Sequence, residues 1–169
     1  MAFVRHDAPP VHVVTGLGLA PGSRILGCAH LEATNTWLMA VWAGLATHGP
    51  GGARLRPWTE IERVTLDRDT ALMTVYPVDQ DQPAERFSLG PKDKRLIQVI
   101  NERVKASVLA VEYVPVDGGP IRVALRRPAQ GDPFVQVITP KRAAAAAGAV
   151  QAEIAVAADR LREAVGLPA

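Results

Sequence analysis

Few residues in this chain have the type and spacing that catalysis or metal binding requires. Cys28 and His30 form a Cys-x-His pair on one face of an expected strand, but a metal site would need two more suitable ligands. No two histidines have the i,i+4 spacing of a helical zinc motif; they are His6, His12, His30 and His48. No serine lies in the Gly-x-Ser-x-Gly setting of a nucleophile elbow. The sequence therefore predicts a protein that is not an enzyme, has no cofactor and holds no tightly bound metal.

Two other patterns resemble ligand loops but lack the residues that define them. The glycine-rich run at residues 16–22 contains a Pro-Gly step where a dinucleotide-binding loop needs the start of a helix. Asp67 and Asp69, like Asp79 and Asp81, lack the glycine and the distant glutamate of a calcium loop. We interpret the first run as a flexible arm and the aspartates as solvated turn residues.

The best candidates for ligand binding are basic. Lys94 and Arg95 begin an expected helix, and Arg122 and Arg126 share one face of an expected strand. If these four side chains converge on one concavity, they form a site for an anionic group. The alternative is a set of solvated charges with no ligand. Three tryptophans are better explained by packing than by a ligand cage; they are Trp37, Trp42 and Trp58.

Composition excludes several classes of protein. The chain has 169 residues, of which 48% are hydrophobic and 21% charged, with a formal net charge of +2. These values are typical of a globular protein and not of a disordered one, and the small basic excess does not predict nucleic-acid binding. A single cysteine, Cys28, excludes an internal disulfide framework and suits a cytoplasmic protein. The many Ala, Arg, Gly, Pro and Val residues are typical of a high-GC bacterial coding sequence.

The termini and the apolar segments indicate no membrane insertion. Residues 1–7 lack the basic and apolar regions of a signal peptide. The most apolar window, residues 36–46, is about half the length that a bilayer-spanning helix requires. We expect residues 1–22 to form a flexible arm that contains one short edge strand at residues 11–14.

Alternating and β-branched segments predict a series of strands followed by one amphipathic helix. Residues 92–106 carry apolar side chains at helical spacing, so Leu96, Ile100 and Val104 are expected to be buried against the strands. The preceding strands are expected at residues 24–31, 36–42, 45–47, 54–56, 57–66, 71–76 and 85–89.

The last third of the chain repeats this order on a smaller scale. Three strands are expected at residues 107–114, 121–126 and 134–138, followed by an alanine-rich helix at residues 143–165. Ile154, Leu161 and Val165 form the apolar stripe of that helix. Alanine favours helix but buries little area, so the helix needs a docking surface. We expect that surface to be the sheet of residues 108–138, where one face of the strand at residues 121–125 is apolar, or another chain.

The segment from Arg54 to Val64 resembles a passage of bacterial pleckstrin-homology-like domains. There a short strand and a Pro-aromatic step, here Pro57-Trp58, lead into an E-I-x-x-V run, here residues 60–64. The T-W-L-M-A-V run at residues 36–41 is similar to the second strand of that family, and the helix at residues 92–106 stands where its capping helix does. The resemblance covers residues 24–107. It implies an α+β fold, a bent antiparallel barrel of seven strands capped by a helix, and a binding role without catalytic residues.

From these observations we expect three parts and two alternative functions. The parts are the arm at residues 1–22, the pleckstrin-homology-like barrel at residues 23–107, and an extension at residues 108–169 that packs on the barrel as three strands and a helix. The first function is a non-catalytic protein-interaction or adaptor module, which binds a protein partner or a second copy of the chain. The alternative is a peripheral binder of anionic lipid headgroups, at a membrane surface, or of other phosphorylated ligands.

Overall fold

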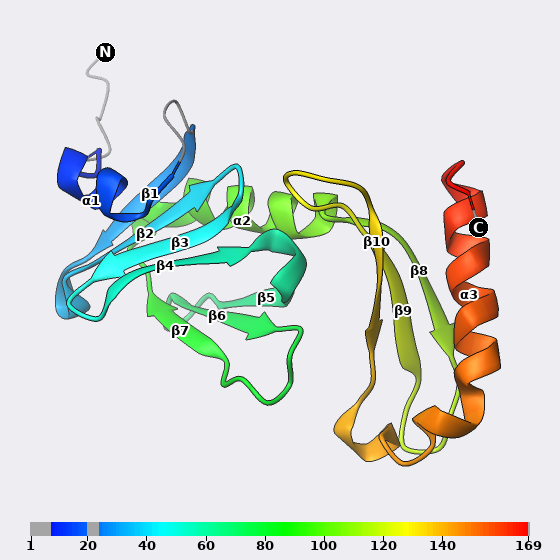
Figure 1. Ribbon diagram of the computed structural model, residues 1–169. Helices are drawn as coiled ribbons and strands as arrows, with labels where there is room; N and C mark the ends of the chain where they lie inside the picture. The colour runs from blue at the N-terminus through cyan, green and yellow to red at the C-terminus, as the bar shows by residue number, and fades with distance from the viewer. Residues whose placement is uncertain (1–7, 20–23, 169) are drawn as a thin grey trace.

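The computed structural model describes residues 8–19 and 24–168 of the chain. Two antiparallel sheets and helix α2 form one part of the molecule, and a third antiparallel sheet with the C-terminal helix α3 stands beside it (Figure 1). The fold is therefore α+β, as the sequence predicts. The first sheet has the strand order β1-β2-β3-β4, the second β5-β6-β7 and the third β10-β9-β8.

The described strands and main helices lie close to the positions expected from the sequence. The helices are α1 (Val11–Gly16), α2 (Lys94–Ala106) and α3 (Gln151–Ala164). The strands are β1 (Ile25–Leu31), β2 (Thr36–Val41), β3 (Gly44–Gly49), β4 (Gly52–Pro57), β5 (Ile61–Asp67), β6 (Leu72–Pro77), β7 (Glu85–Ser88), β8 (Val108–Val114), β9 (Ile121–Arg126) and β10 (Phe134–Ile138).

The first seven strands form two separate sheets, and the expected closed barrel is not observed among the described residues. The division falls at Pro57, the last residue of β4, which has no backbone N–H to donate to a ladder. A short 3-10 turn, Trp58–Glu60, then redirects the chain into β5. The indole Nε1 of Trp58 donates to the carbonyl oxygens of Val41 and Trp42 at 3.1 and 3.0 Å, which fixes this corner.

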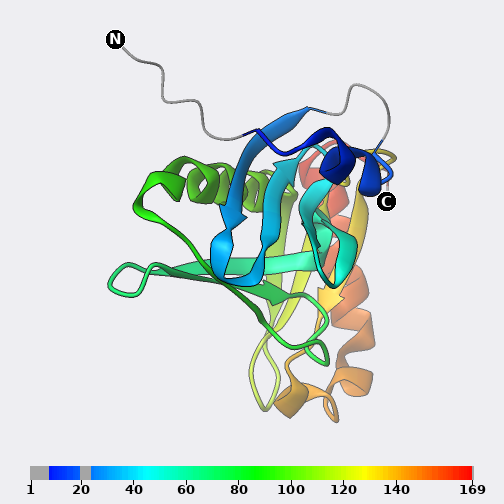
Figure 2. The ribbon, with the colours of Figure 1, turned by 90° about the vertical axis from the view of Figure 1, so that its left-hand side faces the viewer.

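Helix α2 closes the space between these two sheets (Figure 2). Leu96, Ile100 and Val104 are 2%, 0% and 7% exposed, so the predicted burial of this stripe is confirmed. They pack in one cluster with side chains from both sheets, including Leu38 and Met73. Spacings of three and four residues place the stripe on one side of the helix, which explains why the sequence predicts it well.

The N-terminal segment differs from the prediction. Residues 11–14, expected as an edge strand, belong to helix α1, which covers the outer face of the first sheet (Figure 2). Val13 is 2% exposed and packs against Met39 and Val41. Burial of Val13 and Leu17, four residues apart, outweighs the weak helix propensity of valine. Residues 1–7 and 20–22 of the expected arm lie outside the described residues.

Helix α3 packs on one face of the third sheet, as predicted. Ile121, Val123 and Leu125 of β9 are all 0% exposed and lie in one cluster with the buried side of α3. That side consists of Ile154, Ala157, Ala158 and Leu161. The small alanines let the helix approach the sheet closely, and the two larger residues fill the space at either end.

The helix is shorter than expected at both ends. It begins at Gln151, after short 3-10 segments at Lys141–Ala143 and Ala147–Val150. It ends at Ala164, so Val165 lies beyond the helix and is 39% exposed, and its predicted place in the buried stripe is wrong. Gly166 has a φ of 75°, and the N–H of Leu167 donates to the carbonyl of Arg162 at 2.9 Å. This is a Schellman ending, which explains why glycine stops the helix here.

Candidate functional site

The structure does not bring the four predicted ligand-binding residues together. Lys94 and Arg95 are both exposed at the start of α2, but they line different grooves. Arg122 is half-buried on β9. Arg126, at the end of the same strand, is 0% exposed. The expected single concavity is therefore absent from the described part of the chain, because β9 and α2 present these residues to different surroundings.

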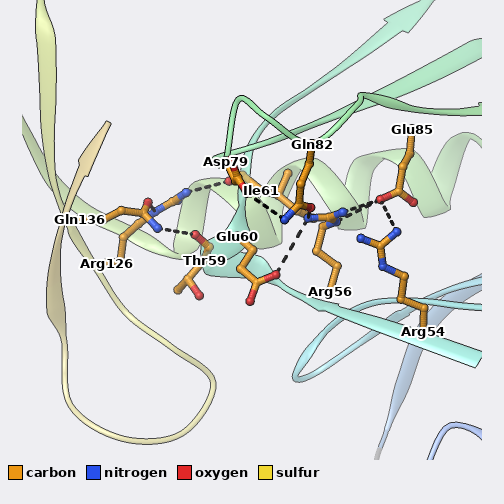
Figure 3. A network of polar contacts seen from close by, with 10 residues as sticks. All are labelled: Arg54, Arg56, Thr59, Glu60, Ile61, Asp79, Gln82, Glu85, Arg126 and Gln136. Atoms are coloured by element: carbon orange, nitrogen blue, oxygen red, sulfur yellow. Dashed lines mark hydrogen bonds and ion pairs between the residues drawn. The ribbon is translucent and has the colours of Figure 1, made fainter. Parts of the chain in front are cut away.

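Arg126 is a buried connection between the two parts of the molecule (Figure 3). Its guanidinium donates from Nη2 to the carbonyl oxygen of Ile61 at 2.7 Å, from Nη1 to Oγ of Ser107 at 2.9 Å, and from Nε to Oε1 of Gln136 at 2.9 Å. Burial, and to a smaller extent the nearby charge of Arg122, lowers the pKa of Arg126 to about 10. The side chain is thus still charged at neutral pH, and each of its three nitrogens donates to a structural acceptor.

Gln136 completes this junction. Its Oε1 accepts from Arg126, and its Nε2 donates to the carbonyl oxygen of Thr59 at 3.0 Å (Figure 3). β9 and β10 are thereby both attached to the corner that joins the first sheet to the second. These contacts position the third sheet against the rest of the molecule, so Arg126 is structural and is not accessible to a surface ligand.

A second buried arginine connects the first two sheets to each other. Arg56 on β4 is 5% exposed and contacts Oε1 of Glu85 on β7 at 2.6 Å. It also donates to Oε1 of Gln82 at 3.0 Å, and Arg54 contacts the same Glu85 oxygen at 3.2 Å (Figure 3). Because this charge is paired and its donors are used, it too is explained by the fold.

Apolar side chains that remain exposed gather on the C-terminal part of the molecule. Seven large hydrophobic residues are exposed among those described, and five of them follow α2 in the sequence. These five are Tyr113 (59% exposed), Phe134 (40%), Val137 (43%), Val156 (48%) and Val165 (39%).

The clearest candidate site on this part is a groove of about 630 Å³ between β8 and α3. Tyr113 and Pro115 line it from the sheet side, and Val156 and Glu153 line it from the helix. β8 is an end strand of its sheet, so one of its two edges has no partner strand among the described residues. An unpaired strand edge beside an apolar groove can accept an additional strand through main-chain hydrogen bonds.

An ion pair fixes one end of this groove. Nη1 of Arg160 on α3 lies 2.6 Å from Oε1 of Glu112 on β8. The Arg160 side chain is nevertheless 64% exposed, so part of its guanidinium remains available to an acceptor outside the chain. Sequence reasoning identifies neither residue, because they are 48 positions apart and meet only when α3 docks on the sheet.

Lys94 lines a different pocket, of about 650 Å³, between α2 and the β5–β6 hairpin. Leu66, Leu89 and Ile97 give it an apolar floor, and Arg68 supplies a second cation at its rim. Neither Lys94 nor Arg68 has a hydrogen bond or ion pair within residues 8–19 and 24–168. An apolar floor with two unpaired cations suits an anion that carries an apolar group. Arg95 lines a separate groove of about 320 Å³ beside β1.

The tryptophans occupy three different environments. Trp58 is 5% exposed and belongs to the core, as expected, whereas Trp37 is half-buried. Trp42 is 54% exposed, donates from Nε1 to the carbonyl of Ala129 at 3.3 Å, and has the guanidinium of Arg103 over its ring at 4.9 Å. Trp42 therefore packs between α2 and the β9–β10 loop instead of in the core.

The histidines and the cysteine do not assemble into a metal site within the described residues. His30 forms a hydrogen bond with Asn35, Nε2 to Oδ1, at 3.1 Å, and its ring lies 4.9 Å from that of Trp37. His12 and His48 come within 6.4 Å of each other, ring centre to ring centre, because α1 docks on the first sheet. His6 lies outside the described residues.

Comparison with known proteins leaves the function to be argued from the structure. No protein-family model matches the sequence, and a search of curated proteins finds no significant match. Among the described residues, every helix is too short or too polar to cross a bilayer.

Proposed function

We propose that this protein is a non-catalytic interaction module built on a pleckstrin-homology-like core. The order of its elements supports the core: a four-stranded sheet, a three-stranded sheet and then one helix that packs between them. The additional sheet and α3 follow this core, and most of the exposed large apolar residues lie there. In this proposal the core is the scaffold and the extension is the binding element.

The observation that carries the proposal is the groove between β8 and α3. It combines an unpaired strand edge with a half-exposed Val156, and Tyr113 is exposed on the other face of the same edge strand. Backbone groups of an edge strand give affinity to an incoming strand, and adjacent apolar side chains give selectivity. Exposed aromatic and branched residues beside charged ones are also the composition of a protein interface.

Val156→Asp tests this proposal, because it places a charge at the centre of the groove without altering the buried side of α3. We expect it to weaken binding of a purified partner about tenfold or more, since a buried unpaired charge costs at least 1.4 kcal/mol. Partners would be identified by mass spectrometry of proteins retained by the wild-type chain, then measured by titration with purified protein.

Val11→Asp is the matched control, since Val11 is 79% exposed but lies on α1, far from the groove in Figure 1. The proposal predicts that it binds like the wild type. Equal binding by Val156→Asp and by Val11→Asp, or no partner other than proteins that both variants retain, would contradict the assignment of this groove.

A second candidate function follows from the pocket at Lys94. The unpaired Lys94 and Arg68 beside an apolar floor favour an anionic lipid headgroup or another phosphorylated ligand. We expect the wild type to sediment with vesicles of phosphatidylcholine that contain phosphatidylserine, and not with phosphatidylcholine alone.

The combination Lys94→Gln and Arg68→Gln should abolish this sedimentation, and added salt should weaken it in the wild type. Arg95→Gln is the matched control, because Arg95 lies in the same first turn of α2 as Lys94 but lines another groove. Binding that is lost equally in the control would indicate attraction to the overall charge of the surface and not a site at this pocket.

A further inference from the structure

We propose that the occupant of the groove between β8 and α3 is a second copy of this chain, related to the first by a two-fold axis. The inference rests on the proposed interaction function and names its partner. In the dimer, β8 pairs antiparallel with β8 of the partner subunit, and α3 lies antiparallel to α3 of the partner subunit. The two third sheets then form one continuous sheet with both helices on the same face.

The first argument is the charge pattern on the flank of α3. Glu153, Val156 and Arg160 are three and four residues apart, so they lie on one side of the helix, and all three line the groove. The acid is at one end, the base is at the other, and the apolar residue is between them. A two-fold axis at the middle of this stripe places Glu153 beside Arg160 of the partner subunit, twice, with the two valines in contact. The surface is therefore complementary to itself, which an isologous interface requires.

The second argument is distance. Helix α3 packs against both β8 and β9, so its axis lies above the space between these two strands. Neighbouring strands are about 4.8 Å apart. If β8 pairs with its copy, the two helices are therefore separated by about 10 Å, which is one strand spacing plus half a spacing on each side. Helices in contact pack at about 8–10 Å. One symmetry operation thus satisfies the strand edge and the helix flank together.

The third argument is the position of the axis along β8. The ion pair with Glu112 places Arg160 level with that residue. The midpoint of Glu153 and Arg160 lies about 5 Å back along α3, at about 1.5 Å per residue. α3 runs opposite to β8 (Figure 1), so a step back along the helix is a step forward along the strand. A distance of about 5 Å corresponds to between one and two strand residues, so the midpoint lies level with a point between one and two residues after Glu112. The axis therefore passes beside Tyr113, which is 59% exposed and points away from α3, on the face of the sheet that Arg122 shares.

The opposite edge of the sheet does not offer the same fit. On the β10 side, Nε2 of Gln136 donates to the carbonyl oxygen of Thr59 in the first part of the molecule. The carbonyl oxygen of Thr139, just after β10, accepts from Nε2 of Gln80. Lys141 contacts Asp81 at 2.8 Å just beyond the end of β10. An approaching strand would meet these segments, whereas β8 has α3 and its complementary stripe alongside.

Charge reversal tests the dimer, and sedimentation velocity measures it. We expect the wild type to be a dimer, and Glu153→Arg and Arg160→Glu each to dimerise at least tenfold more weakly, because each creates two like-charge contacts. A mixture of the two single variants should form heterodimers, since each then meets its opposite charge. The double variant E153R/R160E should dimerise again. Thermal unfolding of each variant checks that these exposed substitutions leave the fold intact.

A cysteine beside the axis gives an independent test. Tyr113→Cys, in a chain with Cys28→Ser, should form a covalent dimer under mild oxidation, because a residue near a two-fold axis faces its own copy. Val137→Cys on β10 is the matched control and should remain a monomer on a non-reducing gel.

A wild type that stays monomeric at its highest soluble concentration, or single charge variants that dimerise like the wild type, would overturn the inference. If the wild type is monomeric but Val156→Asp still removes binding of another protein, only the identity of the partner is wrong. If neither dimer nor sensitive partner exists, the interaction function at this groove fails as well.

Discussion

Arg126→Met is expected to lower the free energy of unfolding by about 1.5–6 kcal/mol, as the balance of two opposing effects. The substitution removes three hydrogen bonds from a charged donor group, to Ile61, Ser107 and Gln136. Such bonds stabilise by about 1.5–3 kcal/mol each. Against this, the wild type bears the cost of burying a charge, which the lowering of the Arg126 pKa from the ordinary value of arginine to about 10 places near 3 kcal/mol. The free energy lost with the three hydrogen bonds is larger than the cost of charge burial that the substitution removes.

The direction of the pKa shift gives this prediction a pH dependence. The folded state holds the Arg126 proton less tightly than the unfolded state does, so the cost of burial is fully present below pH 10. The cost decreases only as the pH rises above about 10, towards the ordinary pKa of arginine. Between pH 6 and 9 the difference in unfolding free energy between the wild type and Arg126→Met should therefore stay constant, apart from changes in other groups.

Urea unfolding measures the difference, and two variants serve as comparisons. Arg122→Met alters a half-buried residue on the same face of β9, and we expect a change of about 0.5 kcal/mol or less. Arg126→Lys should recover little stability, because one ammonium group cannot reach three acceptors that a guanidinium reaches in one plane. Equal stability of Arg126→Met and Arg122→Met would show that the junction contributes nothing to the fold.

Arg126 also shows what the sequence does not reveal. Alternation along β9 correctly places Arg122 and Arg126 on the same face, and that face is opposite to the one that α3 covers. Whether an arginine on that face is solvated depends on a second sheet, which contacts only the end of β9. No local pattern carries this information, because Ile61 is 65 residues away.

The spacing of apolar residues predicts burial correctly where one side of a helix packs on a single continuous core. The stripe of α2 is an example, because every third or fourth residue faces the same two sheets. It was insufficient for α1, where valines favour a strand but Val13 is buried by helix docking on the first sheet. The separation of the first seven strands into two sheets could not be predicted either, since it depends on how the corner at Trp58 directs β5.

The candidate site was predictable in part. The sequence indicated that α3 needs the face of β9, and packing of these two elements in one cluster is observed. That the extension binds a partner or a second copy stays a prediction. It did not indicate the groove, because the groove lies between β8 and the flank of α3, and the flank is defined only once the buried side is known. The sequence analysis selects basic residues as candidate ligand-binding residues because of their charge, whereas the residues that line the groove are mostly small, apolar or acidic.

Removal of residues 151–169 is expected to unfold the third sheet while the first two sheets and α2 remain folded. The deletion exposes Ile121, Val123 and Leu125, each 0% exposed in the intact chain. Burial of one such side chain stabilises by about 1.5–3 kcal/mol, so the loss is roughly 5–9 kcal/mol. That is comparable to the whole stability of a typical domain. The first part of the molecule retains its own core around α2, which contains no residue of α3.

Amide hydrogen exchange measures this result segment by segment. In the truncated chain, protection should disappear from β8, β9 and β10 and persist in β2, β6 and α2. Single substitutions give a milder comparison in the full chain: Leu161→Ala should cost about 2–5 kcal/mol because Leu161 is 5% exposed, whereas Val165→Ala should cost about 0.5 kcal/mol or less. If β9 stays protected without α3, the sheet is stable through its junction at Arg126 alone. The helix would then contribute to the groove but not to the fold, and the two roles assigned to α3 would separate.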